Sequence, residues 1–296
     1  MPDHTARERA QRLTGIALMC GAVASFAVLD TIAKYLNLHM STLEVVWARY
    51  TGAFLFSFML SNPWAQPKLI ISSRPGLQLG RSVLLLASTL CNFAALRYLQ
   101  LDQALALTFS TPFFVATLSG PILGEWVRWR RWTAIAVGFL GILVVTRPGV
   151  GSMHPAALLS LAGAMLYALY AIATRILART DSNATTLFYS NIVGAVALIP
   201  ALPFVWTTPS DPLVIVLMVA TGAVGSFGHY LLIAAHRLAP AALLSPFIYT
   251  EIVLVIALGF LVFGDLPSRW TLAGATIVIG SGLYILQRER AMRGKK

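Results

Sequence analysis

The chain contains ten apolar runs, each close to the length that a helix needs to cross a lipid bilayer. Of its 296 residues, 57% are apolar and only 11% are charged, whereas a soluble domain carries about 25% charged residues. Strands of a membrane barrel would alternate apolar and polar residues, but Val83–Ala87 and Ile252–Leu258 are continuously apolar. The sequence therefore predicts an all-α integral membrane protein with ten transmembrane helices. The predicted spans are residues 13–38, 42–61, 76–98, 102–124, 131–147, 155–178, 184–204, 212–237, 240–264 and 268–287.

The distribution of Lys and Arg predicts the orientation of these spans. The net charge of +11 is spread over segments between apolar runs, which disfavours a nucleic-acid-binding surface. With a cytoplasmic N-terminus, 17 basic residues fall on the inner side and 4 on the outer side, while Arg49 lies within a span. This bias places both termini in the cytoplasm and favours an even number of spans. The inner residues are Arg7, Arg9, Arg12, Lys68, Arg74, Arg81, Arg128, Arg130, Arg131, Arg175, Arg179, Arg237, Arg288, Arg290, Arg293, Lys295 and Lys296, and the outer ones are Lys34, Arg97, Arg147 and Arg269.

The start of the chain also resembles a secretory signal. Basic residues precede the apolar stretch Leu13–Ala24, which ends in an A-x-A pattern. The apolar stretch continues towards Leu38, however, and the internal repeat requires it. We therefore expect an uncleaved first span.

The two halves of the chain resemble each other at an offset of about 140 residues. Ala94-Ala95-Leu96-Arg97 matches Ala234-Ala235-His236-Arg237, and Gly124-Glu125 matches Gly264-Asp265. After a slip of two residues, Trp132-Thr133 matches Trp270-Thr271. A unit of five spans has an odd count, so two tandem units would enter the membrane in opposite directions. Inverted repeats of this kind recur in secondary transporters, where the substrate binds between the halves, and they also occur in channels.

The repeated pattern resembles EamA-type proteins of the drug/metabolite transporter superfamily. It consists of a helix with Pro112 that ends in Gly124-Glu125, then Trp132-Thr133 and a helix with Gly138 and Gly141. The second copy departs from the family pattern, with Ile252 in place of the usual Pro and Asp265 in place of the usual Glu. The resemblance implies two five-helix repeats, residues 13–147 and 155–287, between a cytoplasmic tail (1–12) and a basic cytoplasmic tail (288–296). Within the superfamily the chain resembles bacterial aromatic amino-acid exporters of the YddG type, which implies a bacterial inner membrane protein.

Polar side chains at bilayer depth need partners or a cavity. The third span places Ser88 and Asn92 on one helix face, and the eighth span places Ser226, His229 and Tyr230 close together. Cavity lining is one interpretation, and hydrogen bonding between packed helices is the other. We favour lining for Asn92 and His229 and leave both interpretations open for the serines.

Pro112 and Pro246 each interrupt a predicted span. A proline frees the carbonyl four residues earlier, here that of Thr108 or Ala242, and bends the helix. Each bend is either a hinge or a static kink, and the sequence does not separate the two.

Glu251 is the ionisable group placed most centrally in its span. It is a candidate proton carrier or partner for a substrate ammonium group, and a structural carboxyl bonded to Arg49 is the alternative. Asp30 and Lys34 have the i, i+4 spacing of an ion pair within one helix. Glu125 and Asp265 end their spans, where a solvated loop position is expected.

Aromatic residues away from the predicted span ends would suit a pocket for flat ligands, although ordinary packing explains any single one. With neighbouring polar residues, they give ten candidates for substrate binding: Trp47, Tyr50, Asn92, Phe109, Tyr167, Tyr170, His229, Tyr230, Ser245 and Tyr249.

The repeats predict a secondary transporter that works by alternating access through a central cavity, and the resemblance implies that it exports aromatic or other apolar amino acids. A transporter of another metabolite or drug is the alternative. A channel and an intramembrane enzyme are the less favoured alternatives. The enzyme would need a Ser–His set, paired carboxylates or metal ligands, and the histidines form no H-E-x-x-H pattern. The channel would need a filter motif such as TVGYG, which the sequence does not contain. Cys20 and Cys91 lie far apart in apolar runs without metal-type spacing. We expect no catalytic residue, metal or cofactor, and a monomer in the bilayer whose partner is a small molecule.

Overall fold

The computed structural model describes residues 2–60, 70–124, 129–146, 154–177, 180–238 and 244–293, and within these ranges it contains helices and turns but no strands. Glu125 lies outside the described residues. The elements in chain order are α1 (Pro2–Leu36), α2 (Thr42–Leu60), α3 (Pro75–Leu96), α4 (Leu101–Thr108), α5 (Thr111–Leu123), α6 (Trp129–Thr146), α7 (Ala157–Leu177), α8 (Asn183–Ala197), η2 (Ile199–Ala201), α9 (Leu202–Val205), α10 (Pro212–Leu238), η3 (Ser245–Thr250), α12 (Glu251–Leu258), η4 (Gly259–Phe263) and α13 (Arg269–Arg293).

Six helical stretches in the described part are long and apolar enough to cross a bilayer, as judged by length and composition. A helix pairs its backbone N–H and C=O groups internally, which is required in a bilayer because lipid tails offer no hydrogen-bond partners. The all-helical prediction is therefore confirmed. The six stretches are Ala10–Leu36, Pro75–Leu96, Leu101–Leu123, Ala157–Leu177, Ala184–Val205 and Pro212–Ala235.

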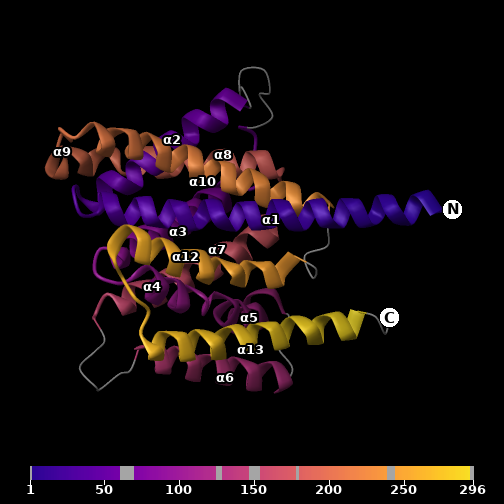
Figure 1. Cartoon of the computed structure of the whole chain (residues 1–296). Coiled ribbons are helices and arrows are strands. Elements are labelled where there is room, and N and C mark those ends of the chain that lie inside the picture. Colours follow the sequence, from indigo (N-terminus) through magenta and orange to yellow (C-terminus); the bar gives the residue numbers. More distant parts are fainter. Residues whose placement is uncertain are drawn as a thin grey trace.

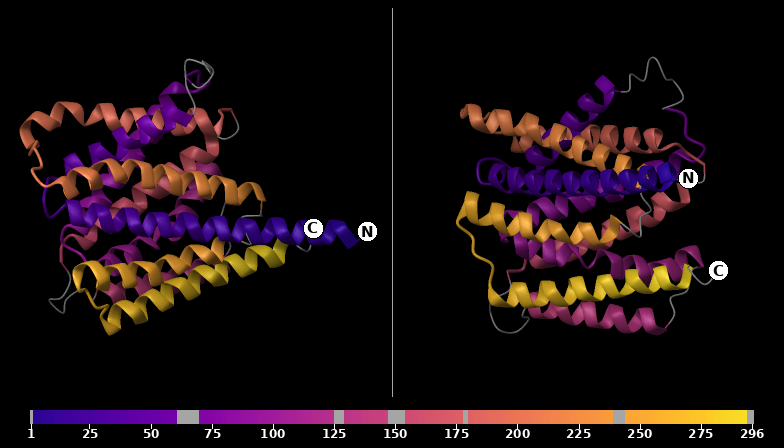
Figure 2. Two further views of the ribbon diagram at one scale, coloured as in Figure 1. Left: turned by 45° about the horizontal axis from the view of Figure 1, so that its top comes forward. Right: turned by 45° about the vertical axis from the view of Figure 1, so that its right-hand side comes forward.

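The helices run roughly parallel to one bundle axis, and both ends of the chain lie at the same end of the bundle (Figures 1 and 2). α1 packs between α10 and α12, α3 packs against α7, and α6 lies beside α13 at one edge. At the ends of the chain, α1 begins at Pro2 and α13 continues to Arg293, beyond the predicted spans.

Glycines allow the closest helix approaches. A Cβ atom on Gly222 of α10 would lie 2.4 Å from the backbone of Gly52 in α2, and one on Gly274 of α13 would lie 2.6 Å from the carbonyl oxygen of Gly141 in α6. Backbones that come this near each other gain packing contacts that a side chain would prevent. These contacts fix the rotation of α10 and of α13 about their axes.

The two prolines lie where helical structure changes. α4 ends at Thr108 and α5 begins at Thr111, so the predicted bend before Pro112 is present. The Thr111 hydroxyl donates a hydrogen bond of 2.8 Å to the freed Thr108 carbonyl. Pro246 lies in the 3-10 segment η3, directly before α12, while Ala242 lies outside the described residues. Whether either break acts as a hinge stays a prediction.

Candidate functional site

Arg49 of α2 is the centre of a group of polar side chains inside the bundle. Its Nη1 donates a hydrogen bond of 3.0 Å to the Thr89 hydroxyl of α3. The guanidinium lies 5.1 Å from the Tyr50 ring and 5.6 Å from the Phe93 ring. The Tyr50 hydroxyl shares a 2.9 Å hydrogen bond with the same Thr89 hydroxyl. The guanidinium is therefore held by one hydroxyl and two aromatic rings.

Two carboxylates from opposite halves of the chain extend this group. Asp30 of α1 interacts electrostatically with Arg49, and Glu251 at the start of α12 interacts electrostatically with Asp30. Both acids are partly buried. The group thus combines one cation and two acids within the bundle. Ionisable side chains are costly inside a membrane, so such a group usually marks a functional site.

The predicted ion pair between Asp30 and Lys34 is wrong. The Lys34 ammonium group lies 2.6 Å from Oδ2 of Asp265 and 4.5 Å from the Phe263 ring. Asp265 lies after η4, where Gly264 reverses the chain with φ of 72°, and it is paired rather than simply solvated as expected. The physical reason is that the loop between η4 and α13 brings a carboxylate closer to Lys34 than its own helix does.

Tyr167 and Tyr170 of α7 extend the aromatic surface around this charged group. Their ring centroids lie 5.2 Å apart. Tyr167 interacts electrostatically with Arg49, Arg81 and Glu251, and yet 41% of its surface is accessible. Tyr167 therefore remains accessible although it lies among charged groups from several helices.

Arg81, one of the basic residues assigned to the inner side, is a buried residue of the third predicted span. It lies within α3 and is only 2% exposed. Its guanidinium donates hydrogen bonds to Thr174, to the Thr186 carbonyl, to Ser190 and to the Tyr170 hydroxyl, the last at 3.2 Å. The Arg81 charge also lies 4.6 Å from the Tyr170 ring. A buried cation surrounded by hydroxyls positions Tyr170 and joins α3 to α7 and α8.

His229 of α10 lies near this group, whereas its neighbour Tyr230 does not. His229 interacts electrostatically with Arg49, and its ring packs edge-on against Phe26 of α1 at 5.0 Å. Tyr230 is 61% exposed, on the same side of α10 as the exposed Val219 and Phe227. The close glycine contacts of α10 with α1 and α2 rotate Tyr230 outward.

The remaining predicted site residues have varied surroundings. Trp47 packs edge-on against Trp206, with ring centroids 5.8 Å apart, and Phe109 is buried between α4 and α5. Asn92 is partly buried on α3. The side chains of Ser245, Tyr249, Pro112 and Pro246 lie outside the described residues.

Ser88 and Ser226, for which both interpretations were left open, have different surroundings in the structure. The Ser88 hydroxyl donates a 2.9 Å hydrogen bond to the Gly163 carbonyl of α7, which is the helix–helix role. The Ser226 hydroxyl oxygen is buried and has no hydrogen-bond partner among the described residues.

Glu44 is a buried carboxylate that the sequence reasoning missed. It accepts hydrogen bonds from the Ser41 amide at 2.8 Å and from the Thr207 amide at 2.6 Å. The Ser41 hydroxyl in turn accepts a hydrogen bond from the Glu44 amide. The pattern Ser-x-x-Glu before an apolar run is the sequence signal of such a helix cap. Glu44 joins the start of α2 to the segment before α10.

Asp181 holds the segment before α3 against the turn between α7 and α8. It accepts hydrogen bonds from Ser72, from the Ser73 amide at 3.0 Å and from Gln78 at 2.8 Å. Slight desolvation opposes the effect of these hydrogen bonds, but together they lower the pKa of Asp181 below its ordinary value of 3.8.

No group of three His, Cys, Asp or Glu side chains in the described part of the chain could hold a metal ion. What the arrangement around Arg49 offers is binding: a cation, two acids and tyrosine rings from both halves of the chain. Such a set suits a small molecule that carries opposite charges and a ring.

Comparisons with known proteins agree with a membrane transporter. The chain is 29% identical to an S-adenosylmethionine uptake transporter of Rickettsia conorii, over 96% of each chain. It is 26% identical to a riboflavin transporter of Vibrio cholerae, over 94% of each, and 26% identical to a pseudopaline exporter of Pseudomonas aeruginosa, over 90% of this chain and 93% of that one.

A solved crystal structure shares the fold, with a TM-score of 0.61 at 16% identity, over 93% of this chain and 96% of the other. The model of the EamA-like transporter family matches residues 13–147 and again residues 154–287. Both matches together span nearly the whole sequence, and the chain belongs to the EamA-like transporter family.

Proposed function

We propose that the protein is a secondary transporter in a bacterial inner membrane, and that it moves a zwitterionic metabolite bearing an aromatic ring. The substrate binds in a central cavity between the two halves of the chain, which opens to one side of the membrane at a time. The observation that carries this proposal is the position of Asp30, which interacts with Arg49 of α2 and also with Glu251 of α12.

The roles of the side chains follow from their charges. Arg49 binds the substrate carboxylate, because a guanidinium matches the planar carboxylate group. Asp30 and Glu251 bind the ammonium group. Tyr167 and Tyr170 provide a surface for the ring, and the partial exposure of Tyr167 supports this placement. Pairing with substrate charges offsets the cost of keeping these side chains in a membrane interior.

S-adenosylmethionine is the first candidate substrate. It combines an amino-acid head with an adenine ring, and similar Rickettsia proteins carry its name as uptake transporters. Aromatic amino acids moved outward are the second candidate, which the tyrosine pair of α7 favours. Riboflavin, the substrate named for other relatives, has a ring without the ammonium and carboxylate groups, so it serves as a discriminating control.

The proposed architecture is ten spans in two inverted five-helix repeats with cytoplasmic termini. Helical segments in each predicted range, the two family matches and the shared end of both termini support it. The test is labelling of single cysteines in intact cells, in a background without Cys20 and Cys91. Residues in 148–154 and 207–211 should react from outside, and those in 128–131 should not; the reverse pattern would refute this topology.

The substrate test is counterflow in liposomes that contain the purified protein. Labelled S-adenosylmethionine, phenylalanine, tryptophan and riboflavin are each supplied outside, with the unlabelled compound inside. We expect saturable exchange of a zwitterion and none of riboflavin, with loss of exchange in Arg49→Gln. Exchange of riboflavin alone, or full activity of Arg49→Gln, would contradict the proposed recognition.

A further inference from the structure

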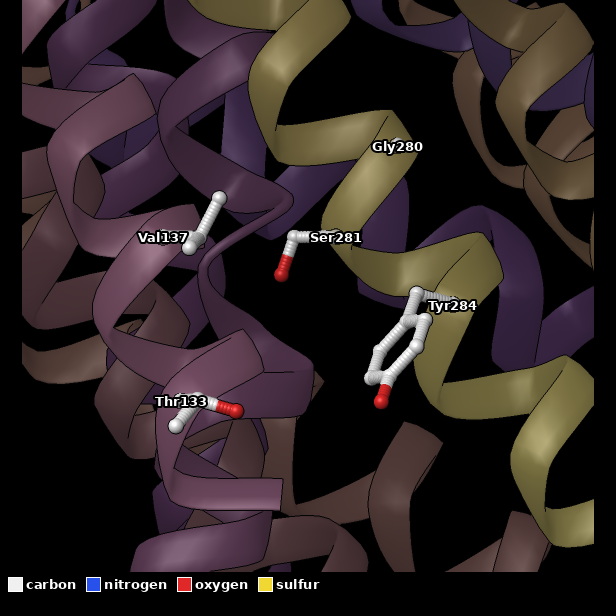
Figure 3. A pocket seen from close by; sticks show the side chains of 5 residues that line it. All are labelled: Thr133, Val137, Gly280, Ser281 and Tyr284. Atoms are coloured by element: carbon white, nitrogen blue, oxygen red, sulfur yellow. The ribbon is translucent and has the colours of Figure 1, made fainter. Parts of the chain in front are cut away.

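The paired helices α6 and α13 form a recess that is separate from the charged group around Arg49. Figure 3 shows it in the space between the two helices. It has a volume of about 300 Å³, and its described lining is mostly apolar. The lining residues are Thr133 and Val137 of α6 and Gly280, Ser281 and Tyr284 of α13.

Small residues explain why space remains at this point. α6 and α13 are in backbone contact at Gly141 and Gly274. Further along, Gly280 has no side chain, and a Cβ atom there would meet no atom within 4 Å. Val137 is 48% exposed and Tyr284 is 45% exposed. The groove therefore opens on the outside of the bundle, where lipid surrounds this helix pair.

Basic residues flank one end of the groove. Arg130 and Arg131 precede Thr133 by less than one turn of α6, and Arg288 follows Tyr284 by about one turn of α13. Because Thr133 and Tyr284 line the same groove, both basic segments belong to the same end of the helix pair. The last two residues of the chain, Lys295 and Lys296, add two more charges after α13.

We propose that this groove binds an anionic phospholipid. One acyl chain lies along Val137 and Gly280, and the phosphate lies at the level of Tyr284, where the arginines attract it. Positive charge at one end of an apolar groove between membrane helices suits a lipid with a negative headgroup. A second copy of the chain is a poorer occupant, because two copies with the same orientation in the membrane would bring their basic segments together.

Native mass spectrometry of delipidated protein tests this proposal without any transport assay. The protein is exposed to equal amounts of phosphatidylglycerol and phosphatidylcholine in detergent. We expect wild type to retain phosphatidylglycerol preferentially. Gly280→Leu fills the groove and should abolish that preference, whereas Gly80→Leu, at another exposed helical glycine with nothing within 4 Å of its Cβ position, should keep it. Replacing Arg288 and Arg290 by Gln should lower the retention of phosphatidylglycerol by about fivefold for each charge removed.

Three outcomes would overturn the proposal. Wild type retaining the two lipids equally would remove the role of charge. Undiminished phosphatidylglycerol binding in Gly280→Leu would place the lipid elsewhere. Dimer masses in wild type that Gly280→Leu abolishes would show that a second copy occupies the groove.

Discussion

The ammonium group of Lys34 in α1 lies 2.6 Å from the carboxylate of Asp265, in the loop between η4 and α13. This ion pair joins the first half of the chain to the second at the end of the bundle opposite the two termini. Both side chains are partly buried, with 12% and 25% of their surfaces exposed. A contact between the two halves at one end of the bundle has the position of a gate.

If the pair keeps this end closed, Asp265→Asn should raise access to the cavity from that side. A partly exposed ion pair contributes about 1 kcal/mol, which corresponds to roughly a fivefold change in the open population. The measurement is maleimide labelling of Tyr167→Cys in a background without Cys20 and Cys91. The swap Lys34→Asp with Asp265→Lys should restore slow labelling, and Arg269→Gln in the same region is the control. Equal labelling rates in all variants would contradict a gating role.

Glu251 is expected to set any response of transport to a proton gradient. Glu251→Gln keeps the size of the side chain and most of its hydrogen bonding but cannot titrate. Transport in liposomes with an imposed pH gradient should respond in wild type and not in Glu251→Gln, while Asp211→Asn in an exposed loop behaves as wild type. An equal response in the Gln variant would exclude Glu251 as the proton carrier. If wild type ignores the gradient, Glu251→Gln should instead raise the KM for a substrate with an ammonium group.

The neighbours His229 and Tyr230 provide a matched pair of substitutions. His229 lies near Arg49 and packs on Phe26, whereas Tyr230 is exposed. His229→Ala should lower the transport rate by about tenfold or more if it lines the cavity, and Tyr230→Ala should leave the rate unchanged. Thermal stability of each purified variant is the control for folding. A loss of transport in Tyr230→Ala at normal stability would show that the exposed face of α10 matters.

The close approach of Gly222 and Gly52 predicts a stability difference between two glycine substitutions. Ala at 222 places a Cβ atom 2.4 Å from the Gly52 backbone, and overpacking of this kind costs about 1–3 kcal/mol. Ala at 280 meets nothing within 4 Å and improves helix propensity. The Tm of Gly222→Ala should fall, and that of Gly280→Ala should stay equal or rise. A tolerated Gly222→Ala would mean that α2 and α10 can separate without loss.

The lowered pKa of Asp181 predicts that the stability of the fold decreases at acid pH. Its pKa is lower in the folded protein than the ordinary 3.8, so the folded state stabilises the ionised carboxylate. This contribution is fully present above pH 3.8 and is lost as the pH falls through the lower folded pKa. The Tm of wild type should therefore fall more between pH 6 and pH 3 than that of Asp181→Asn. Parallel curves would show that its hydrogen bonds do not stabilise the fold.

The sequence by itself determined the helical fold class and much of the helix order. Long apolar runs can meet the hydrogen-bonding demand of a bilayer only as helices or closed barrels, and the absence of alternation excludes the barrel. Pro112 likewise predicted the break between α4 and α5, because a proline removes one backbone donor wherever the helix lies. Such properties depend on residues that are near one another in the chain.

The tertiary structure decided which partner each polar side chain meets. Spacing placed Asp30 within reach of Lys34, but the loop at Asp265 comes closer. Counting charges placed Arg81 on the inner side near the start of the third span, and only the structure shows that hydroxyls from α7 and α8 accept its hydrogen bonds inside the bundle. Periodicity placed His229 and Tyr230 together, but the glycine contacts of α10 turned only one of them inward. Helical period fixes which residues share a face; packing between distant segments fixes what that face touches.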